Sequence, residues 1–454
     1  MRSRFAMVWV LAVVLALVAA ACSSDDSGTE DSTTTSSAQA ETTTTTTTAA
    51  PAETTTTEAV PVGVSCDEPV KIGVITDQSG PLAIYGAHIM RAFPLGMEYA
   101  TESVGPDSYQ LDDCTIEIIY KDDLSDAETS ATIARELIEV DGVDIIVGSV
   151  SSGVTAGIQE LALQNDVIHI AAPAAANDLT GVTFNPNSFR TSRNNYQDAV
   201  NMCQYLVAVY STFVQIAPDY SFGYGGAAAF RDACTFFGGS FPGDDIFAPA
   251  DTTDFTPYME QINDVDAEAF LVTWAGGGFV PLAQAAVDLG TLDDKEMAAG
   301  FVDNVVMPIF FGNNIGSTSG ILYHYTLPLN PVNDWLVEKV AELGTVPDLF
   351  DADAMNAGIM IVKALRITRG DASADALRAA MEGMSFEGPK GTIDIRAEDH
   401  VAIQDMYIVR LENLDDPDFA YFAPVATNRP PVPCLLEGEY ADRCGDLSVG
   451  SLGG

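Results

Sequence analysis

Residues 70–101 read VKIGVITDQSGPLAIYGAHIMRAFPLGMEYAT, and this stretch sets the pattern of the chain. The β-branched run Val70–Thr76 predicts a buried strand, and Gly80 with Pro81 predicts a turn. The following stretch, Ala83–Thr101, has the length and composition of a helix. A strand followed by such a helix is the first half of a βαβ unit, in which parallel strands flank a crossover helix.

The same alternation of short apolar runs and longer helical stretches continues to Leu289. Buried apolar strands separated by helices predict parallel sheets that are covered by helices. The number of βα units is larger than a single sheet usually contains, so the predicted fold class is α/β with two doubly wound parallel-sheet lobes. Further strands are expected at Thr115–Tyr120, Val143–Val147, Val167–Ala171, Phe213–Ala217 and Ala269–Trp274, and further helices at Asp126–Glu139, Gly153–Gln164, Tyr196–Val209, Tyr224–Phe237, Phe255–Asn263 and Phe279–Leu289.

The N-terminal region has the composition of a targeting segment and a tether. Residues 1–21 carry two early arginines and then an apolar run that ends in small residues, which predicts a secretory signal peptide. The segment Ala19–Cys22 resembles the bacterial lipobox, so Cys22 is the expected lipid attachment site, with plain secretion and a free Cys22 as the alternative. Residues 22–64 are rich in Ser and Thr and predict a disordered tether. The expected location is extracytoplasmic, on the cell membrane, as a lipoprotein.

The charge of the chain excludes one class of partner. The sequence has 65 acidic and 20 basic residues, for a formal net charge of −45. Phosphate backbones are bound by Lys and Arg surfaces, so no nucleic-acid partner is expected, and direct attraction to anionic lipid headgroups is disfavoured. We interpret the carboxylates as a solvated acidic surface that maintains solubility, with cation binding as the alternative.

Six cysteines remain beyond Cys22, and an even number in an exported chain favours disulfides. One pair enters early strands, a second lies on predicted helices that flank one strand, and a third closes a short loop in the tail. No cysteine or histidine spacing suggests a metal site, and no cofactor is expected. The favoured pairs are Cys66–Cys114, Cys203–Cys234 and Cys434–Cys444.

The candidate ligand-binding residues lie on strand-to-helix loops, because open α/β sheets bind ligands beyond the carboxyl ends of their strands. Hydroxyls and N–H groups where a helix begins suit a carboxylate, and small residues let a ligand approach the backbone. Each candidate could instead be structural, as a cap, a tight loop or a solvated acid. Arg190, in a predicted crossing between lobes, could equally brace a loop or bind ligand. The candidates are Tyr85, Ser151, Ser152, Ala174, Ala175, Ala176, Phe222, Gly276, Gly277 and Asp303.

The ordered pieces of sequence from Val70 to Leu411 resemble the type I solute-binding proteins of ABC importers, the group that includes branched-chain amino acid, amide and urea receptors. No single piece is specific, but their order and spacing together are. The matching pieces are Lys71–Val74, Ser79–Pro81, Tyr85-Gly86, Tyr120–Asp123, Val147-Gly148, Ser151-Ser152, Phe189–Thr191, Phe222-Gly223, Thr253–Thr256, Gly388–Ile393 and Met406–Val409.

The resemblance implies two lobes joined by three crossovers, near Arg190, Leu327 and Asp399, that close over a ligand and present it to a membrane permease. It also implies, from members that bind amino acids, that Ser152 and the backbone after the fourth strand hold the ligand's α-carboxylate, while an acid near Asp303 holds its ammonium group. The expected lobes are 65–190 with 327–398, and 191–326 with 399–454, the latter including a C-terminal tail.

One position departs from those amino acid receptors. Where they have a Thr after the fourth strand, this chain has Ala176, which removes a polar contact to a branched-chain amino acid. An amide, a urea-like compound or an organic acid therefore stand beside an amino acid as expected ligands.

The expected function is that of a monomeric, lipid-anchored receptor that passes a small polar ligand to ABC permease subunits. A tethered sensor or structural lipoprotein of the same fold, without a transporter, is the alternative. An exported hydrolase is a third reading, but the sequence has no Gly-x-Ser-x-Gly elbow and no metal-ligand spacing. No enzyme activity and no catalytic residue are therefore expected.

Overall fold

The computed structural model describes residues 63–300 and 302–453. The predicted signal peptide, Cys22 and the tether up to residue 62 lie outside the described residues. Within the described ranges, the helices are all too short or too polar to cross a membrane.

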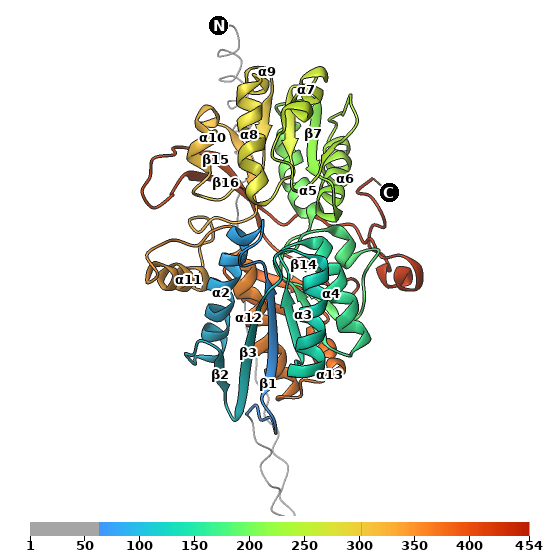
Figure 1. Cartoon of the computed structure of the whole chain (residues 1–454), viewed down its shortest axis with the longest axis vertical. Helices are drawn as coiled ribbons and strands as arrows, with labels where there is room; N and C mark the ends of the chain where they lie inside the picture. Colours follow the sequence, from blue (N-terminus) through green and yellow to red (C-terminus); the bar gives the residue numbers. More distant parts are fainter. Residues whose placement is uncertain (1–62, 301, 454) are drawn as a thin grey trace, which may run out of the picture. The chain divides into compact units, whose positions relative to one another are not determined.

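The first sheet has six strands in the order β2-β3-β1-β4-β5-β6. All neighbouring pairs are parallel except β2 with β3. This sheet carries the helices that follow its strands, drawn in blue to green in Figure 1. The strands are β1 (Val70–Thr76), β2 (Ser108–Leu111), β3 (Cys114–Asp122), β4 (Ile145–Gly148), β5 (Ile168–Ala171) and β6 (Ser188–Arg190), and the helices are α2 (Ala83–Thr101), α3 (Ala127–Glu136), α4 (Ser152–Gln164) and the short η1 (Leu137–Asp141) and η2 (Asn177–Thr180).

The second sheet has four parallel strands in the order β10-β9-β7-β8. Its strands and helices are the green to yellow part of Figure 1. The strands are β7 (Phe213–Pro218), β8 (Ile246–Ala248), β9 (Ala269–Val272) and β10 (Glu296–Ala298), and the helices are α5 (Asn195–Leu206), α6 (Ser221–Phe236), α7 (Thr256–Asp264), α8 (Phe279–Asp288), α9 (Thr291–Asp294), α10 (Met307–Phe310) and the short η3 (Gly276–Gly278) and η4 (Gly312–Asn314).

The C-terminal third adds helices and two small antiparallel sheets, ordered β11-β15-β16 and β12-β13-β14. Helix α12 packs along α2, so the chain returns to the first sheet after building the second. These elements are β11 (Thr318–Ile321), α11 (Pro331–Ala341), α12 (Asp351–Thr368), α13 (Ala374–Met381), β12 (Ser385–Gly388), β13 (Gly391–Ile395), β14 (Ala402–Ile403), β15 (Met406–Leu411), β16 (Phe422–Asn428) and the short η5 (Gly438–Cys444).

Each large sheet has its own hydrophobic core. The core of the first sheet joins residues such as Ile72, Ile145 and Phe93 to Met355 of α12. The second sheet is covered on its two faces by separate clusters, one around Phe270 and one around Phe213. Two sheets with separate cores confirm the predicted α/β fold with two lobes, which we call the first and second lobe after their sheets.

The antiparallel pairings were not predicted, and β2 shows why. Ser108–Leu111 joins β3 through only two residues, Asp112 and Asp113. Asp112 has a positive φ of 54°. A two-residue connection produces an antiparallel hairpin, because a parallel pair needs a long crossover. The short strand lacks the apolar run by which the other strands were recognised.

The three predicted disulfides are confirmed. Cys66–Cys114 joins the segment before β1 to β3, and Cys203–Cys234 joins α5 to α6. Cys434–Cys444 closes a loop in the tail. Each of the first two bonds therefore lies inside one lobe.

Candidate functional site

Four of the predicted residues line one cavity between loops of the two lobes. Tyr85, Ser152 and Ala175 come from the first lobe, and Phe222 comes from the second. The cavity has a volume of about 30 Å³. Typical ligand pockets are about 300–1,000 Å³, so the lobes must separate before this one can admit a ligand. The remaining lining residues are Leu82, Val150, Pro173, Arg193, Tyr220, Ala275 and Phe350.

A second cavity, of about 190 Å³, shares Tyr85 with the first. It is lined by three more of the predicted residues, Gly276, Gly277 and Asp303. The rest of its wall is mostly apolar and includes Phe279. We call the residues that line these two cavities the binding region. Seven of the ten predicted residues therefore fall in it, on both sides of Tyr85.

Tyr85 links the two lobes directly. It lies in the first turn of α2, and its hydroxyl oxygen accepts a hydrogen bond of 3.1 Å from the N–H of Gly276. Gly277 N–H donates to the carbonyl of Pro81 at 3.3 Å. Gly276 has a φ of +74°, and a Cβ there would lie 2.6 Å from the Pro81 oxygen. Glycine at this position therefore permits the close approach of the two loops.

The Ser152 hydroxyl is anchored by the loop that follows β5. Ser152 opens α4, and its Oγ accepts hydrogen bonds from the N–H groups of Ala175, at 3.3 Å, and Ala176, at 3.1 Å. A hydroxyl has two acceptor lone pairs and one proton, so these bonds use its acceptor capacity. The proton can then be donated to a ligand in the cavity.

Three predicted residues lie outside the lining of both cavities. Ser151 is the residue that caps α4, although its side chain makes no capping hydrogen bond. The carbonyls of Ala174 and Ala176 accept hydrogen bonds of 2.7 Å from the two terminal nitrogens of Arg190. Arg190 is fully buried, and burial lowers its pKa to about 9. Arg190 therefore braces the loop, and of the three alanines only Ala175 reaches the cavity.

The sequence analysis missed Arg193 and two of the four aromatic residues that line the first cavity, Tyr220 and Phe350. Arg193 lines the same cavity as Ser152, and its guanidinium lies 5.2 Å from the ring centre of Phe350. It donates to the carbonyl of Pro173 at 3.1 Å and pairs with Asp198 at 3.3 Å. Its position just after Arg190, in the predicted crossing between lobes, was the signal that could have identified it. A guanidinium and a hydroxyl that line the same cavity can both donate hydrogen bonds to a carboxylate.

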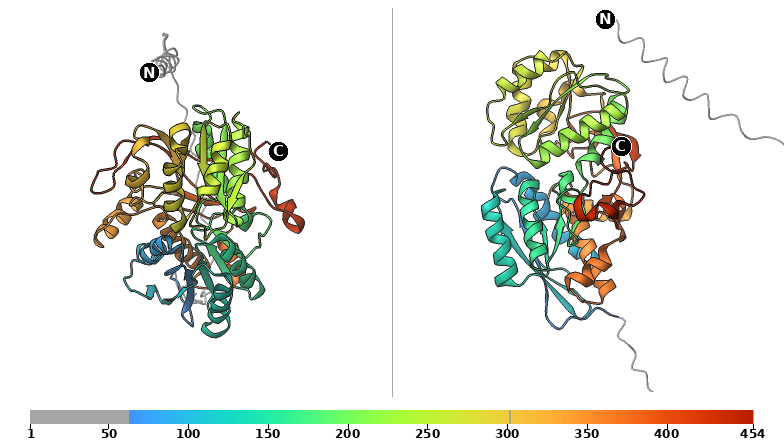
Figure 2. Two further views of the ribbon diagram at one scale, coloured as in Figure 1. Left: turned by 45° about the horizontal axis from the view of Figure 1, so that its top comes forward. Right: turned by 90° about the vertical axis from the view of Figure 1, so that its right-hand side faces the viewer.

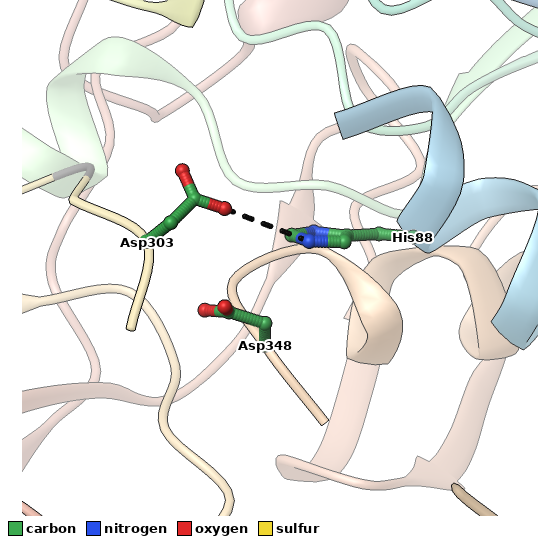
Figure 3. A group of neighbouring side chains, drawn as sticks. All are labelled: His88, Asp303 and Asp348. Carbon is green, nitrogen blue, oxygen red and sulfur yellow. Dashed lines mark ion pairs between the residues drawn. The ribbon is translucent and has the colours of Figure 1, made fainter. Parts of the chain in front are cut away.

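Asp303 lies in a buried group of titratable side chains contributed by both lobes. Its Oδ1 lies 3.6 Å from Nε2 of His88 on α2, and Asp348 completes the group (Figure 3). Burial and the charge of Asp348 raise the pKa of Asp303 to about 8. Burial lowers the pKa of His88. The group therefore carries carboxylates that are costly to ionise without a positive charge nearby.

His88, Asp303 and Asp348 are residue types that can also hold a metal ion. Their ligand atoms all lie within 4.8 Å of one another. His88 Nδ1 accepts a hydrogen bond of 3.4 Å from the N–H of Phe350, which leaves the ring proton on Nε2, the atom that faces Asp303. A metal ion would need Nε2 without its proton and Nδ1 as a donor. The arrangement fits a shared proton or a cationic ligand group better than a metal ion.

Comparison with known proteins gives a consistent result. A family model described as "Periplasmic binding protein" matches residues 69–416. The "Leu/Ile/Val-binding protein homolog 6" of Brucella melitensis is 27% identical over 352 residues, which cover 74% of this chain and 86% of the relative. An ABC-type branched-chain amino acid transporter structure from Rhodopseudomonas palustris is 31% identical, with a TM-score of 0.67 and coverage of 81% and 100% of the two chains. A solute binding protein from R. palustris BisB5, in complex with 3,4-dihydroxy benzoic acid, is 25% identical, with a TM-score of 0.70 and coverage of 80% and 98%.

Proposed function

Since the chain belongs to the periplasmic binding protein family, whose members are solute-binding proteins of ABC transporters and not enzymes, we propose that its own ligand is a small carboxylate-bearing solute with an apolar body. One observation carries the proposal: Ser152 and Arg193 face the same cavity as the rings of Tyr85, Phe222 and Phe350. Polar groups that fix orientation within a mainly apolar wall are the usual composition of a small-molecule site.

The carboxylate would lie against Ser152 and Arg193. The Ser152 hydroxyl can donate one hydrogen bond, and the guanidinium supplies positive charge in a buried setting where charge-assisted hydrogen bonds are strong. The apolar body would lie against the rings of Tyr85, Phe222 and Phe350, which line the same wall. Aromatic side chains provide large apolar contact areas for such a group.

The second cavity determines which ligand class we favour. Asp303 is a buried acid that lines the second cavity, and Tyr85 lines both cavities, so a ligand that bears both a carboxylate and an ammonium group can use both of them. We therefore favour an amino acid with an apolar side chain. The second candidate is an aromatic acid, which is supported by the ring-lined cavity and by the relative solved with 3,4-dihydroxy benzoic acid. An aromatic acid without an ammonium group would leave Asp303 protonated.

A thermal-shift screen of the purified protein tests this proposal. The panel should hold amino acids, aromatic acids, amides and urea-like compounds. A ligand that binds only the folded protein stabilises it by about 2.7 kcal/mol at a concentration one hundred times its Kd, so a true ligand raises the melting temperature. Calorimetric titration of each hit then gives its affinity. If only compounds without a carboxylate bind, the proposed ligand class is wrong.

We also propose that the protein is held outside the cytoplasm by a lipid on Cys22, acts as a monomer and delivers its ligand to ABC permease subunits. Its lobes are assigned to residues 65–190 with 327–398, and 191–326 with 399–454. The anchor is tested in cells with Cys22→Ser, using Ser23→Ala as the control. The first variant should lose radiolabelled palmitate and leave the membrane fraction, while the second keeps both. A Cys22→Ser protein that still carries palmitate would contradict the anchor.

A further inference from the structure

The C-terminal tail, residues 429–453, is a segment that the proposed function does not use. The family match ends at residue 416, so the tail lies beyond the shared part of the chain. In the structure it is ordered around its own disulfide, Cys434–Cys444. Figure 2 shows the tail, in red, beside the region where the chain passes between the two lobes. Its contacts indicate what it does there.

One part of the tail is bound to the first lobe. The ring of Phe184, just before β6, packs against Tyr440 with ring centres 5.1 Å apart, and lies 5.2 Å from the guanidinium carbon of Arg443. Arg443 also donates to Oε1 of Glu382, just after α13, at 2.9 Å. Two further bonds of Arg443 reach the backbone carbonyls of residues 397 and 398, at 2.6 and 2.7 Å.

Another part of the tail is bound to the second lobe. Val432 is buried in the cluster formed by α5 and α6, and Leu452 packs against the same cluster. The N–H of Leu452 donates to Oδ2 of Asp232 on α6 at 2.9 Å. The tail therefore contacts the second lobe both before and after its contacts with the first lobe.

The connection between these contacts has little slack. Cys434 N–H donates to the carbonyl of Ser448 at 2.7 Å, and Gly450 N–H donates to the carbonyl of Cys434 at 3.0 Å. The disulfide joins Cys434 to Cys444 as well. A chain can lengthen by up to about 3.3–3.6 Å per residue only when it is free to extend, and these cross-links prevent that. A motion that separates Arg443 from Asp232 must therefore either break these internal bonds or release Leu452 from Asp232 and from its cluster.

We propose that residues 429–453 form a clasp that connects the two lobes beside the crossovers and limits how far they open without ligand. This proposal rests on the proposed function only in assuming that the lobes open and close. Hinge closure in such proteins is carried by a few residues between rigid lobes, so a strap across that region sets the range of motion. A narrower open state would also reduce the conformational cost of ligand binding.

The test measures lobe opening in the ligand-free protein. Spin labels are placed on the exposed residues Glu160 of α4 and Gln284 of α8, and their distance distribution is measured by electron–electron double resonance. One variant ends the chain after Asn428, and a second combines Cys434→Ser and Cys444→Ser with Arg443→Ala. Both should show a broader distribution whose mean is shifted by several ångströms from that of the intact protein.

The matched control is the pair Cys66→Ser and Cys114→Ser, which removes a disulfide within the first lobe, in a hydrophobic cluster that contains no residue of the tail. This control should lose stability but keep the distance distribution of the intact protein. An unchanged distribution in a folded clasp variant would overturn the proposal, as would an equal broadening in the control. The triple substitution keeps the test valid if the shortened chain does not fold. Because no ligand is present, the result does not depend on the thermal-shift screen.

Discussion

At the scale of single residues, Ser151 and Ser152 are neighbours with different surroundings. Only Ser152 lines the cavity, and its Oγ is fixed by two N–H donors of the following loop. We expect Ser152→Ala to weaken binding of a carboxylate ligand by about 1–2 kcal/mol, or about tenfold in Kd. Ser151→Ala should leave Kd nearly unchanged. Calorimetric titration with the best ligand from the screen measures both. Equal losses in the two variants would show that Ser152 does not contact the ligand.

Asp303 makes the stability of the ligand-free protein depend on pH. Its pKa is raised to about 8 in the folded protein and is about 3.9 in an unfolded chain. The folded state therefore binds more protons between these values, so the stability contributed by this group is present below about pH 4 and is lost as the pH rises to about 8. Asp303→Asn should remove that part of the slope. Denaturant unfolding from pH 4 to pH 9 measures it.

The comparison variant for this prediction is Asp251→Asn, which changes an exposed carboxylate with the same chemistry. The free energy of unfolding of Asp303→Asn minus that of the wild type should be larger at pH 9 than at pH 4 by at least about 1 kcal/mol, because only the wild type loses the stability that protonated Asp303 contributes. Asp251→Asn should show no comparable change. If the free energies of unfolding of Asp303→Asn and the wild type depend on pH in the same way, the pKa of Asp303 does not differ between the folded and unfolded protein, and the prediction is wrong.

The residues of the binding region could be predicted only where the backbone pattern marked them. Ser152 and Ala175 lie in the loops that follow predicted strands, and the carboxyl ends of parallel strands meet at one edge of a sheet. His88 and Asp348, which lie next to Asp303 but do not line either cavity, carry no such signal, because one lies within a helix and the other precedes a helix far along the chain. Arg193 lies in the segment predicted to cross between the lobes, and the sequence did not mark it as a ligand-binding residue. Their proximity depends on how the two lobes pack, which local patterns do not specify.

At the scale of elements, helices α2 and α12 are in contact through their backbones. A Cβ on Gly358 would lie 2.7 Å from the backbone nitrogen of Met97, and one on Gly96 would lie 2.3 Å from the oxygen of Met355. Gly358→Ala should therefore force the helices apart and lower the free energy of unfolding by about 1–3 kcal/mol. The change is measured by denaturant unfolding in ligand-free buffer.

Gly157, in the middle of α4, is the matched control because a Cβ there would meet nothing within 4 Å. Gly157→Ala should increase the free energy of unfolding by about 0.5–1 kcal/mol, since alanine loses less backbone entropy in a helix than glycine. The two substitutions thus have opposite expected signs. A neutral or stabilising Gly358→Ala would show that the two helices can separate at little cost.

The sequence predicted the elements of the βα alternation closely. Strand β1 and helix α2 begin and end at the expected residues, because a mostly apolar run rich in β-branched residues and a long amphipathic stretch are strong local signals. Past Leu289 the alternation stops, and α11, α12 and α13 were not assigned. The short β12 and β13 lie in an antiparallel sheet whose alternating burial is a weaker signal than a continuous apolar run.

At the scale of the whole molecule, the formal net charge of −45 has a consequence for stability that no single contact shows. Like charges on a compact surface repel one another, and unfolding relieves that repulsion by moving them apart. Salt screens the repulsion, because the Debye length falls from about 30 Å at 0.01 M to about 10 Å at 0.1 M ionic strength. The folded state should therefore gain stability as salt is added.

We expect the melting temperature to rise by a few degrees between about 10 and about 300 mM added salt, the range over which the repulsion becomes short-ranged. Scanning calorimetry measures this change. Sodium chloride, potassium chloride and choline chloride should act alike at equal ionic strength, because screening depends on ionic charge rather than identity. A rise in melting temperature with sodium or potassium but not with choline would indicate bound cations. The interpretation of the carboxylates as a cation-binding surface would then be preferred to that of a solvated acidic surface. No response to any salt would mean that the carboxylates are already neutralised by partners within the fold.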